Sequence, residues 1–309
     1  MGMEMNGGVW PTMITPFTDD NRIDYDGLGK LVDWYVERGV HGLFAVCQSS
    51  EMFHLTLEER VSLASFVKEA AAGRVPVIAS GHISDAFEDQ VKELNAMAGT
   101  GIDALVLITN RLASQEESDD VWIERLERLL TELPEDVTLG LYECPYPYKR
   151  LLTPKTIKWC ADQERFRFLK DTSCDIDAIR AKLEAVNGSG LRIYNANSAT
   201  LLETLKIGAV GYSGVMANFH PELYVRLVEN WRERGEEAGS LSDFLSLSSL
   251  IEKQLYPANA KYYLMLEGIL SHGSCRTQQG RTLTATNRLE VEQLRRLCGA
   301  YAERFKGLQ

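Results

Sequence analysis

One lysine stands where an amine is normally avoided, at the end of an apolar, strand-like run. Lys170 falls near the end of the segment 166–172, whose side chains would alternate between the two faces of a strand. Lys170 would then share a face with Phe168 and not with Asp171. A free lysine titrates at about 10.4, and an apolar wall lowers that pKa by disfavouring the charged form. The run predicts an uncharged Schiff-base nucleophile, although a lysine that snorkels to solvent fits it as well.

Two other stretches carry groups that such an amine could use. Tyr142 ends the preceding strand-like run, one strand and helix unit before Lys170, so neighbouring strands could bring phenol and amine together. The turn 47–51 reads Cys-Gln-Ser-Ser-Glu, and its hydroxyl and amide groups can hydrogen-bond a carboxylate. If the substrate is an anion, these groups could hold it.

Composition excludes several classes of function. The chain has 309 residues, of which 45% are hydrophobic and 25% charged, as is typical of globular proteins. A net charge of −11 without a basic block argues against nucleic acid and anionic membranes as partners. The charge-free run 207–221 is interrupted by glycines and shorter than the roughly 20 apolar residues of a membrane span. We expect no membrane segment.

The sequence also predicts whether the protein binds a metal or cofactor and where in the cell it lies. The histidines and acids show no metal-ligand spacing, so we predict no metal and no other cofactor. Six cysteines are scattered without a C-x-x-C pair, and most are expected to be buried thiols. Residues 1–6 lack the basic and apolar pattern of a signal peptide, which predicts a cytoplasmic protein.

Short apolar runs alternate with longer amphipathic stretches along the chain. Strands are expected at 9–17, 42–48, 76–81, 104–109, 137–145, 166–172, 192–197 and 210–216. Helices are expected at 25–38, 57–72, 85–98, 119–133, 154–161, 176–186, 199–205 and 221–234. Eight such pairs predict an α/β fold, a closed (β/α)8 TIM barrel rather than an open sheet. About three further helices follow, which divides the chain into a barrel at 1–236 and a C-terminal helical extension at 237–309 packed on it.

The order of the strand ends resembles the dihydrodipicolinate synthase and N-acetylneuraminate lyase superfamily, the class I or Schiff-base aldolases, over nearly the whole chain. The most specific pieces are Thr-Met-Ile-Thr-Pro-Phe at 12–17, Tyr142 with Pro145 three residues later, Lys170 on its strand, and the segment 211–218. Active sites of such barrels collect at the carboxyl ends of the strands.

The resemblance implies an activity and residue roles. Lys170 would condense with the ketone of pyruvate or another 2-oxo acid, and Tyr142 would relay protons. Ser49 and Ser50 fall where relatives hold the carboxylate, and Ser213 would contribute backbone to the same site. The implied function is a lyase that reversibly joins or cleaves a 2-oxo acid and an aldehyde. Relatives are commonly tetramers built from dimers, so a homo-oligomer is expected.

The chain also departs from the family pattern. Relatives read Gly-Thr-Thr-Gly-Glu or Gly-Ser-Thr-Gly-Glu where 47–51 stands. Asn110 aligns with a relay tyrosine that the synthases donate across a subunit interface. Pro147 aligns with their carboxylate-binding arginine, with Lys149 and Arg150 close enough to compensate in part. These changes argue against synthase activity in the lysine pathway.

Two other functions stay open at this point. A dehydratase of a deoxy-keto sugar acid would use the same Lys170 and Tyr142, and a barrel that binds a 2-oxo acid without turnover fits the missing relay groups. His82 follows a predicted strand, but we expect a solvent-bonded loop histidine there and leave it out of the site. Glu143 alternates away from Tyr142 and is expected to be a structural hydrogen-bond partner.

Overall fold

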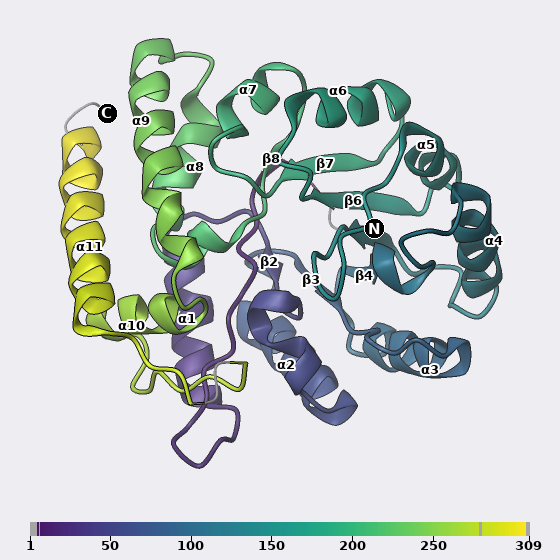
Figure 1. Ribbon diagram of the computed structural model, residues 1–309, viewed down its shortest axis with the longest axis horizontal. Coiled ribbons are helices and arrows are strands. Elements are labelled where there is room, and N and C mark those ends of the chain that lie inside the picture. The colour runs from purple at the N-terminus through teal and green to yellow at the C-terminus, as the bar shows by residue number, and fades with distance from the viewer. Residues whose placement is uncertain (1–4, 6, 278–279, 307–309) are drawn as a thin grey trace.

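The computed structural model describes residues 5, 7–277 and 280–306 (Figure 1). Residues 1–4 and 6, which belong to the pattern behind the cytoplasmic prediction, lie outside the described part. In Figure 1 the parallel strands lie at the centre and the helices around them. The C-terminal helices form a separate layer at one side. This is the predicted barrel with its helical extension.

Eight parallel strands make up the described sheet, in the order β1-β8-β7-β6-β5-β4-β3-β2. Their bounds are β1 Gly8–Val9, β2 Leu43–Phe44, β3 Val77–Ser80, β4 Ala104–Ile108, β5 Leu139–Tyr142, β6 Phe166–Asp171, β7 Arg192–Asn195 and β8 Gly211–Tyr212. The ring closes just beyond β1, where Phe44 pairs with Thr12. Phe44 accepts a hydrogen bond from Met13 N at 3.0 Å and donates one to Pro11 O at 3.1 Å.

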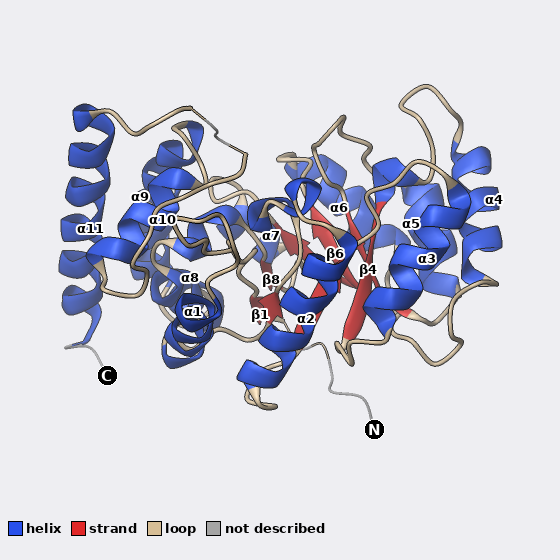
Figure 2. Cartoon of the chain, turned by 90° about the horizontal axis from the view of Figure 1, so that it is seen from below, coloured by secondary structure: helices blue, strands red, loops and turns tan. Residues whose placement is uncertain are grey.

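Helices follow the strands and cover the outside of the barrel, as the view from below shows (Figure 2). They are α1 Tyr25–Glu37, α2 Leu57–Ala71, α3 Phe87–Ala98, α4 Asp119–Leu130, α5 Pro154–Asp162, α6 Ile176–Ala185, α7 Leu201–Lys206 and α8 Pro221–Asn230. Thr56 caps α2 in a capping box with Glu59, and Thr153 caps α5 ahead of a proline at its first position. No helix of the described residues is long and apolar enough to cross a bilayer.

The described part of the C-terminal extension contains the predicted three helices. They are α9 Gly235–Ser248, α10 Ala258–Leu266 and α11 Ala285–Lys306, and a short 3-10 helix, η5 Ser249–Lys253, links α9 to the loop before α10. In Figure 1, α9 and α11 stand beside α8 at the edge of the barrel. Helix α9 starts at Gly235, next to the expected boundary at 236, and the division into two domains stays a prediction.

Several strands are shorter than the apolar runs that predicted them. The run 9–17 contributes only the end of the short β1, which pairs with β8, and then single bridges from Thr12 to Phe44 and from Phe17 to Ile23. The run 210–216 ends as a strand at Tyr212, and a 3-10 helix, η4 Val215–Asn218, takes its place. Both departures lie at the carboxyl end of the barrel, where the backbone must turn around a cavity.

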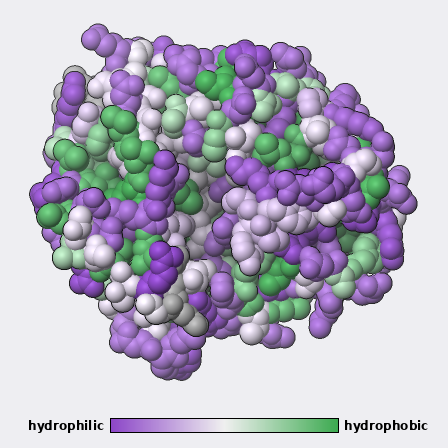
Figure 3. Space-filling model, viewed as in Figure 1, coloured by the Kyte–Doolittle hydropathy of each residue, from purple (hydrophilic) through white to green (hydrophobic). Residues whose placement is uncertain are grey.

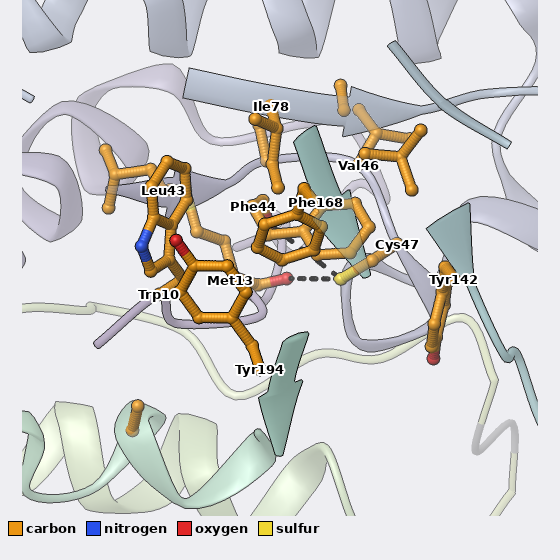
Figure 4. Close-up of a cluster of buried hydrophobic side chains, with 14 of the residues drawn as sticks. Trp10, Met13, Leu43, Phe44, Val46, Cys47, Ile78, Tyr142, Phe168 and Tyr194 are labelled. Atoms are coloured by element: carbon orange, nitrogen blue, oxygen red, sulfur yellow. Dashed lines mark hydrogen bonds between the residues drawn. The ribbon is translucent and has the colours of Figure 1, made fainter. Parts of the chain in front are cut away.

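Aromatic rings fill the barrel below that cavity (Figure 4). Phe168 of β6 stacks on Tyr194 with ring centroids 4.5 Å apart, and lies 5.5 Å from Trp10 and 6.0 Å from Phe44. Gly42 leaves room for the Trp10 indole, because a Cβ at residue 42 would lie 2.4 Å from the ring. Phe168 therefore faces the barrel interior, as strand alternation predicts.

Candidate active site

Lys170 lies near the carboxyl end of β6, between Tyr142 of β5 and Tyr194 of β7 in the strand register. Only 4% of the lysine is exposed. Its Nζ lies 4.9 Å from the centroid of the Tyr142 ring. The predicted meeting of amine and phenol is confirmed, and the snorkelling alternative is wrong because the amine is buried inside the barrel.

A cavity of about 460 Å³ opens above Lys170 at this end of the barrel. It is lined by Gln48, Ser49, Tyr142, Pro145, Lys170, Thr172, Ala196, Gly214, Val215, Glu252, Lys253, Tyr256, Pro257 and Thr277. The volume lies within the range of small-molecule sites. Polar groups converge on one amine, an arrangement suited to a small polar carbonyl compound.

Burial changes the pKa of the Lys170 amine. It lowers the pKa of Lys170 to about 8, and the nearby Cys47, Cys144 and Glu252 oppose this with smaller effects. About a tenth of the amine is then neutral at pH 7, compared with less than about one part in a thousand for a free lysine. A neutral amine is the nucleophilic form. The predicted lowering of the pKa is confirmed.

Tyr142 remains protonated across the working pH range. Burial, followed by the nearby Cys144 and Cys47, raises the pKa of Tyr142 well above its usual value. Burial also raises the pKa of the Cys144 thiol to about 11. The phenol is therefore a hydrogen-bond donor beside the amine and can act as a base only after it has given up its proton.

The three predicted serines have different surroundings. Ser49 lines the cavity, and its hydroxyl donates to Thr12 Oγ1 at 3.2 Å. Ser50 holds the turn together, because its Oγ accepts from Cys47 N at 2.9 Å and donates to Cys47 O at 2.6 Å. Ser213 has a buried hydroxyl without a described hydrogen-bond partner and precedes the cavity-lining Gly214. Only Ser49 brings a side chain to the cavity.

Five of the described cavity residues come from the C-terminal extension and were not predicted. They are Glu252, Lys253, Tyr256, Pro257 and Thr277. Burial raises the pKa of the Glu252 carboxyl, and Lys170 partly offsets this. The sequence analysis searched the strand ends, and the extension has no strand. The only signal in the sequence was the charged pair at 252–253 with Tyr-Pro at 256–257, and its spacing does not connect it with the strand ends.

Asn110 organises the loop after β5 and does not line the cavity. Its Nδ2 lies within hydrogen-bond distance of the carbonyls of Cys144 at 2.8 Å, Tyr146 at 3.0 Å and Tyr148 at 2.5 Å. The Tyr148 hydroxyl donates back to Asn110 O at 2.7 Å. The residue aligned with the relay tyrosine therefore has a structural task here.

The expectation that Lys149 or Arg150 compensates for Pro147 is wrong. Lys149 Nζ donates to Thr172 O at 2.7 Å, and the Arg150 guanidinium donates to loop carbonyls, including Glu117 O at 3.0 Å. Neither side chain lines the cavity. Both cations are used to fix the rim of the barrel.

His82 and Glu143 are structural. The expectation of a solvent-bonded His82 is wrong, because the ring is fully buried and its Nε2 accepts from Ile108 N at 2.5 Å. Burial lowers the pKa of His82 to about 3, so the ring is neutral. Glu143 accepts from Leu152 N at 2.8 Å and Thr172 N at 3.0 Å, which confirms its predicted structural role.

Comparison with known proteins is consistent with this geometry. Residues 5–294 match the sequence model of the Dihydrodipicolinate synthetase family. The 4-hydroxy-tetrahydrodipicolinate synthase of Bacillus subtilis is 27% identical, over 85% of this chain and 90% of its own length. That of Porphyromonas gingivalis is 27% identical, over 93% of this chain and 97% of its own.

Solved structures share the fold. A dihydrodipicolinate synthase from Bacillus anthracis superposes with a TM-score of 0.85 at 20% identity, covering 95% of this chain and 99% of its own. The enzyme from Acinetobacter baumannii, solved in complex with pyruvate, gives 0.84 at 22% identity and covers 96% and 99%. At these identities the likeness extends to the fold alone.

Proposed function

The chain belongs to the dihydrodipicolinate synthetase family, and on that premise we propose that it is a Schiff-base lyase. It reversibly joins or cleaves a 2-oxo acid, with pyruvate as the first candidate, and an aldehyde. Lys170 is the nucleophile and Tyr142 the proton donor and acceptor. Ser49, with the backbone of its turn, binds the carboxylate of the 2-oxo acid.

The observation that carries this proposal is the buried amine of Lys170 at the wall of the cavity. Its lowered pKa, about 8, gives a nucleophile near neutral pH without a metal or cofactor to activate the substrate. The phenol ring of Tyr142 lies 4.9 Å away. A lysine kept for structure would be paired with a carboxylate, as Lys182 is with Asp171 at 2.5 Å.

Each step follows from these groups. The neutral amine of Lys170 adds to the ketone carbon, and a proton moves from nitrogen to oxygen to give a carbinolamine. A second proton, delivered through Tyr142, converts the hydroxyl into departing water and leaves a C=N⁺ iminium. The iminium withdraws electrons, so the adjacent methyl carbon loses a proton to give an enamine. The enamine carbon then adds to the aldehyde, and the reverse sequence cleaves the product.

Two further features belong to the proposal. We place the protein in the cytoplasm and expect a homodimer or homotetramer. The exposed leucines Leu247, Leu250 and Leu297 support an assembled state, because they lie on one face of the C-terminal helices. Figure 3 shows apolar side chains gathered on that side of the molecule. Exposed patches of this kind often mark protein contacts.

Reductive trapping tests the function. The protein is incubated with pyruvate and close analogues, borohydride is added, and the modified peptide is mapped by mass spectrometry. We expect a pyruvate adduct on Lys170 and none on Lys253, a lysine that lines the same cavity. Lys170→Met is the control that should not label. Absence of label with every 2-oxo acid would contradict the proposal.

Product analysis separates the related activities. A lyase forms a new carbon–carbon bond when pyruvate and an aldehyde are supplied together. A dehydratase releases water from a keto sugar acid and leaves the carbon skeleton intact. Label on Lys170 without proton exchange at the pyruvate methyl group would indicate a binding barrel instead.

A further inference from the structure

The Lys170 cavity contains a second phenol, which comes from the C-terminal extension of the same chain. We propose that Tyr256 is a catalytic residue of this site and passes protons to and from the reacting oxygen together with Ser49. This inference rests on the proposed function. It also means that one chain supplies every proton-relay side chain of its own active site.

The position of Tyr256 is fixed by buried side chains. Its hydroxyl accepts a hydrogen bond from Asn218 Nδ2 at 3.1 Å. Asn218 is itself held in place, because Nδ2 also donates to Thr12 O at 2.9 Å and Tyr35 OH donates to Oδ1 at 2.5 Å. A phenol held in this way keeps one orientation at the cavity wall. Catalytic groups need such preorganisation.

Hydroxyl groups connect Tyr256 to the turn that is proposed to bind the carboxylate. Ser49 hydrogen-bonds to Tyr256, and its Oγ donates to Thr12 Oγ1 at 3.2 Å. Burial raises the pKa of Tyr256 well above its usual value. The phenol is therefore protonated, and a chain of three hydroxyls can hand a proton along without a stable charge on any of them.

Iminium formation requires proton transfer to the reacting oxygen, which such a chain can provide. When Lys170 adds to the ketone, the oxygen gains one proton from the amine and one more before it leaves as water. Tyr142 can supply one proton and must then be reprotonated, because its raised pKa disfavours the phenolate. Tyr256 lines the same cavity as Tyr142 and Lys170. It can protonate the reacting oxygen, or Tyr142 itself through bound water. Water that enters the open cavity then returns the proton to Tyr256, directly or by way of Ser49.

Tyr256 is the second phenol of the cavity. Among the described residues, Tyr142 and Tyr256 are the tyrosines that line the cavity. The amide of Asn110 is engaged with three loop carbonyls outside it. The position aligned with an intersubunit tyrosine in relatives therefore contributes no relay group. A phenol from the chain's own extension is available instead.

The test uses pyruvate alone and needs no knowledge of the aldehyde. Enamine formation exchanges the methyl protons of pyruvate for deuterium in heavy water, which NMR follows directly. In Tyr256→Phe we expect exchange to slow at least about tenfold, while the amount of Lys170 adduct trapped at equilibrium is retained. Tyr262→Phe is the matched control, since that phenol lies in the same extension and donates to Glu292. An unchanged exchange rate in Tyr256→Phe would overturn the inference.

A second variant separates catalysis from structure. 3,5-Difluorotyrosine at position 256 keeps the ring and its hydrogen bonds but makes the phenol more acidic. We expect an altered exchange rate with an unchanged melting temperature, and an unaltered rate would assign Tyr256 a structural role. If the unmodified protein forms no adduct with any 2-oxo acid, the proposed function fails and the inference fails with it. If pyruvate labels Lys170 normally and changes at Tyr256 leave the exchange rate unaltered, the inference fails and the proposed function stands.

Mixing two variants tests the within-chain assignment. Lys170→Met and Tyr256→Phe chains are expressed together, so that any oligomer contains both. If Tyr256 serves its own chain, the mixture exchanges no faster than the Tyr256→Phe chains it contains. Recovery of exchange in the mixture would show that the phenol acts on a neighbouring chain and would contradict the assignment.

Discussion

Glu51 and Lys261 form a buried ion pair of 2.7 Å between the turn after β2 and helix α10. Neither side chain is exposed. The second oxygen of Glu51 accepts from the backbone N–H groups of Arg276 and Thr277, at 2.6 and 2.7 Å. One carboxylate thus fastens the C-terminal extension to the turn that carries Ser49, and the cavity depends on both.

Replacing Lys261 by methionine tests this connection. The change leaves the buried Glu51 carboxylate without its cation, and removing one partner of a buried pair costs about 3–5 kcal/mol. We expect a loss of that order in the free energy of unfolding, measured with urea. Pyruvate trapping on Lys170 should also slow, because the Ser49 turn loses its support.

The matched control is Lys158→Met, which removes an exposed i,i+4 pair with Asp162 on helix α5. Exposed pairs of this type contribute less than about 0.5 kcal/mol. If both methionine variants unfold at the same urea concentration, Glu51 is adequately held by its backbone N–H donors, and the ion pair has no measurable part in stability.

Adduct formation should depend on pH through Lys170. Only the neutral amine attacks the ketone, and with a pKa of about 8 the neutral fraction rises roughly tenfold from pH 7 to pH 9. Tyr142 and Cys144 stay largely protonated over this interval because burial raises the pKa of each. The rate is measured by quenching timed samples at one common pH. A midpoint near 10.5, the value of an unburied lysine, would contradict the assignment.

Lys170 should also destabilise the fold. Because its folded pKa lies below 10.5, the unfolded chain binds more protons between about pH 8 and 10.5, and stability rises with pH across that window. Lys170→Met removes the penalty, which is fully present below pH 8 and amounts to at most about 3 kcal/mol. We expect the variant to melt at a higher temperature at pH 7, with the difference shrinking by pH 10. An equal or lower melting temperature at pH 7 would show that the buried amine carries no such cost.

Tyr142→Phe should separate adduct formation from turnover. The ring beside Lys170 is retained, so the amine keeps its apolar surroundings and we still expect it to be labelled by pyruvate. Loss of the hydroxyl removes general acid–base work, which lowers proton exchange and turnover by about 100-fold or more. Turnover equal to that of the unchanged protein would remove Tyr142 from the mechanism.

The pair at the centre of the site was predictable because strand alternation is a local rule. The parity of 166–172 places Lys170 inside and Asp171 outside, and the structure confirms both, since Asp171 pairs with Lys182. Adjacency of Tyr142 and Lys170 follows from consecutive strands in a parallel barrel. Predicting these features requires only the order of the strands and helices along the chain and the two-residue alternation of side chains in a strand.

The groups that come from the extension could not be predicted in this way. Tyr256 reaches the cavity because α10 is fastened to the barrel by Lys261 and Glu51, residues far apart in the sequence. No periodicity encodes that contact. The environment of His82 was misjudged for the same reason, because it depends on Gln90 of α3 and Ile108 of β4, which close over the ring. Side-chain contacts between elements that are distant in the sequence decide these environments, and the pattern of a single sequence does not predict such contacts.

Burial already raises the pKa of Glu143 to about 7 beside Lys182, and Lys182→Met is expected to raise it further and to make stability depend more strongly on pH than in the unchanged protein. Although burial opposes the charge on Lys182, the neighbouring Glu143 and Asp171 raise its pKa, and both carboxylates are fully buried. Without the amine they face each other at the ends of β5 and β6, and one of them must take up a proton, which the folded state then binds more tightly than the unfolded chain. Stability of the variant should therefore fall as pH rises from about 5 to 8, as urea unfolding at the two pH values will show. Lys206→Met, which removes only an exposed pair with Glu203, is the control, and equal unfolding midpoints of Lys182→Met at pH 5 and pH 8 would contradict this account.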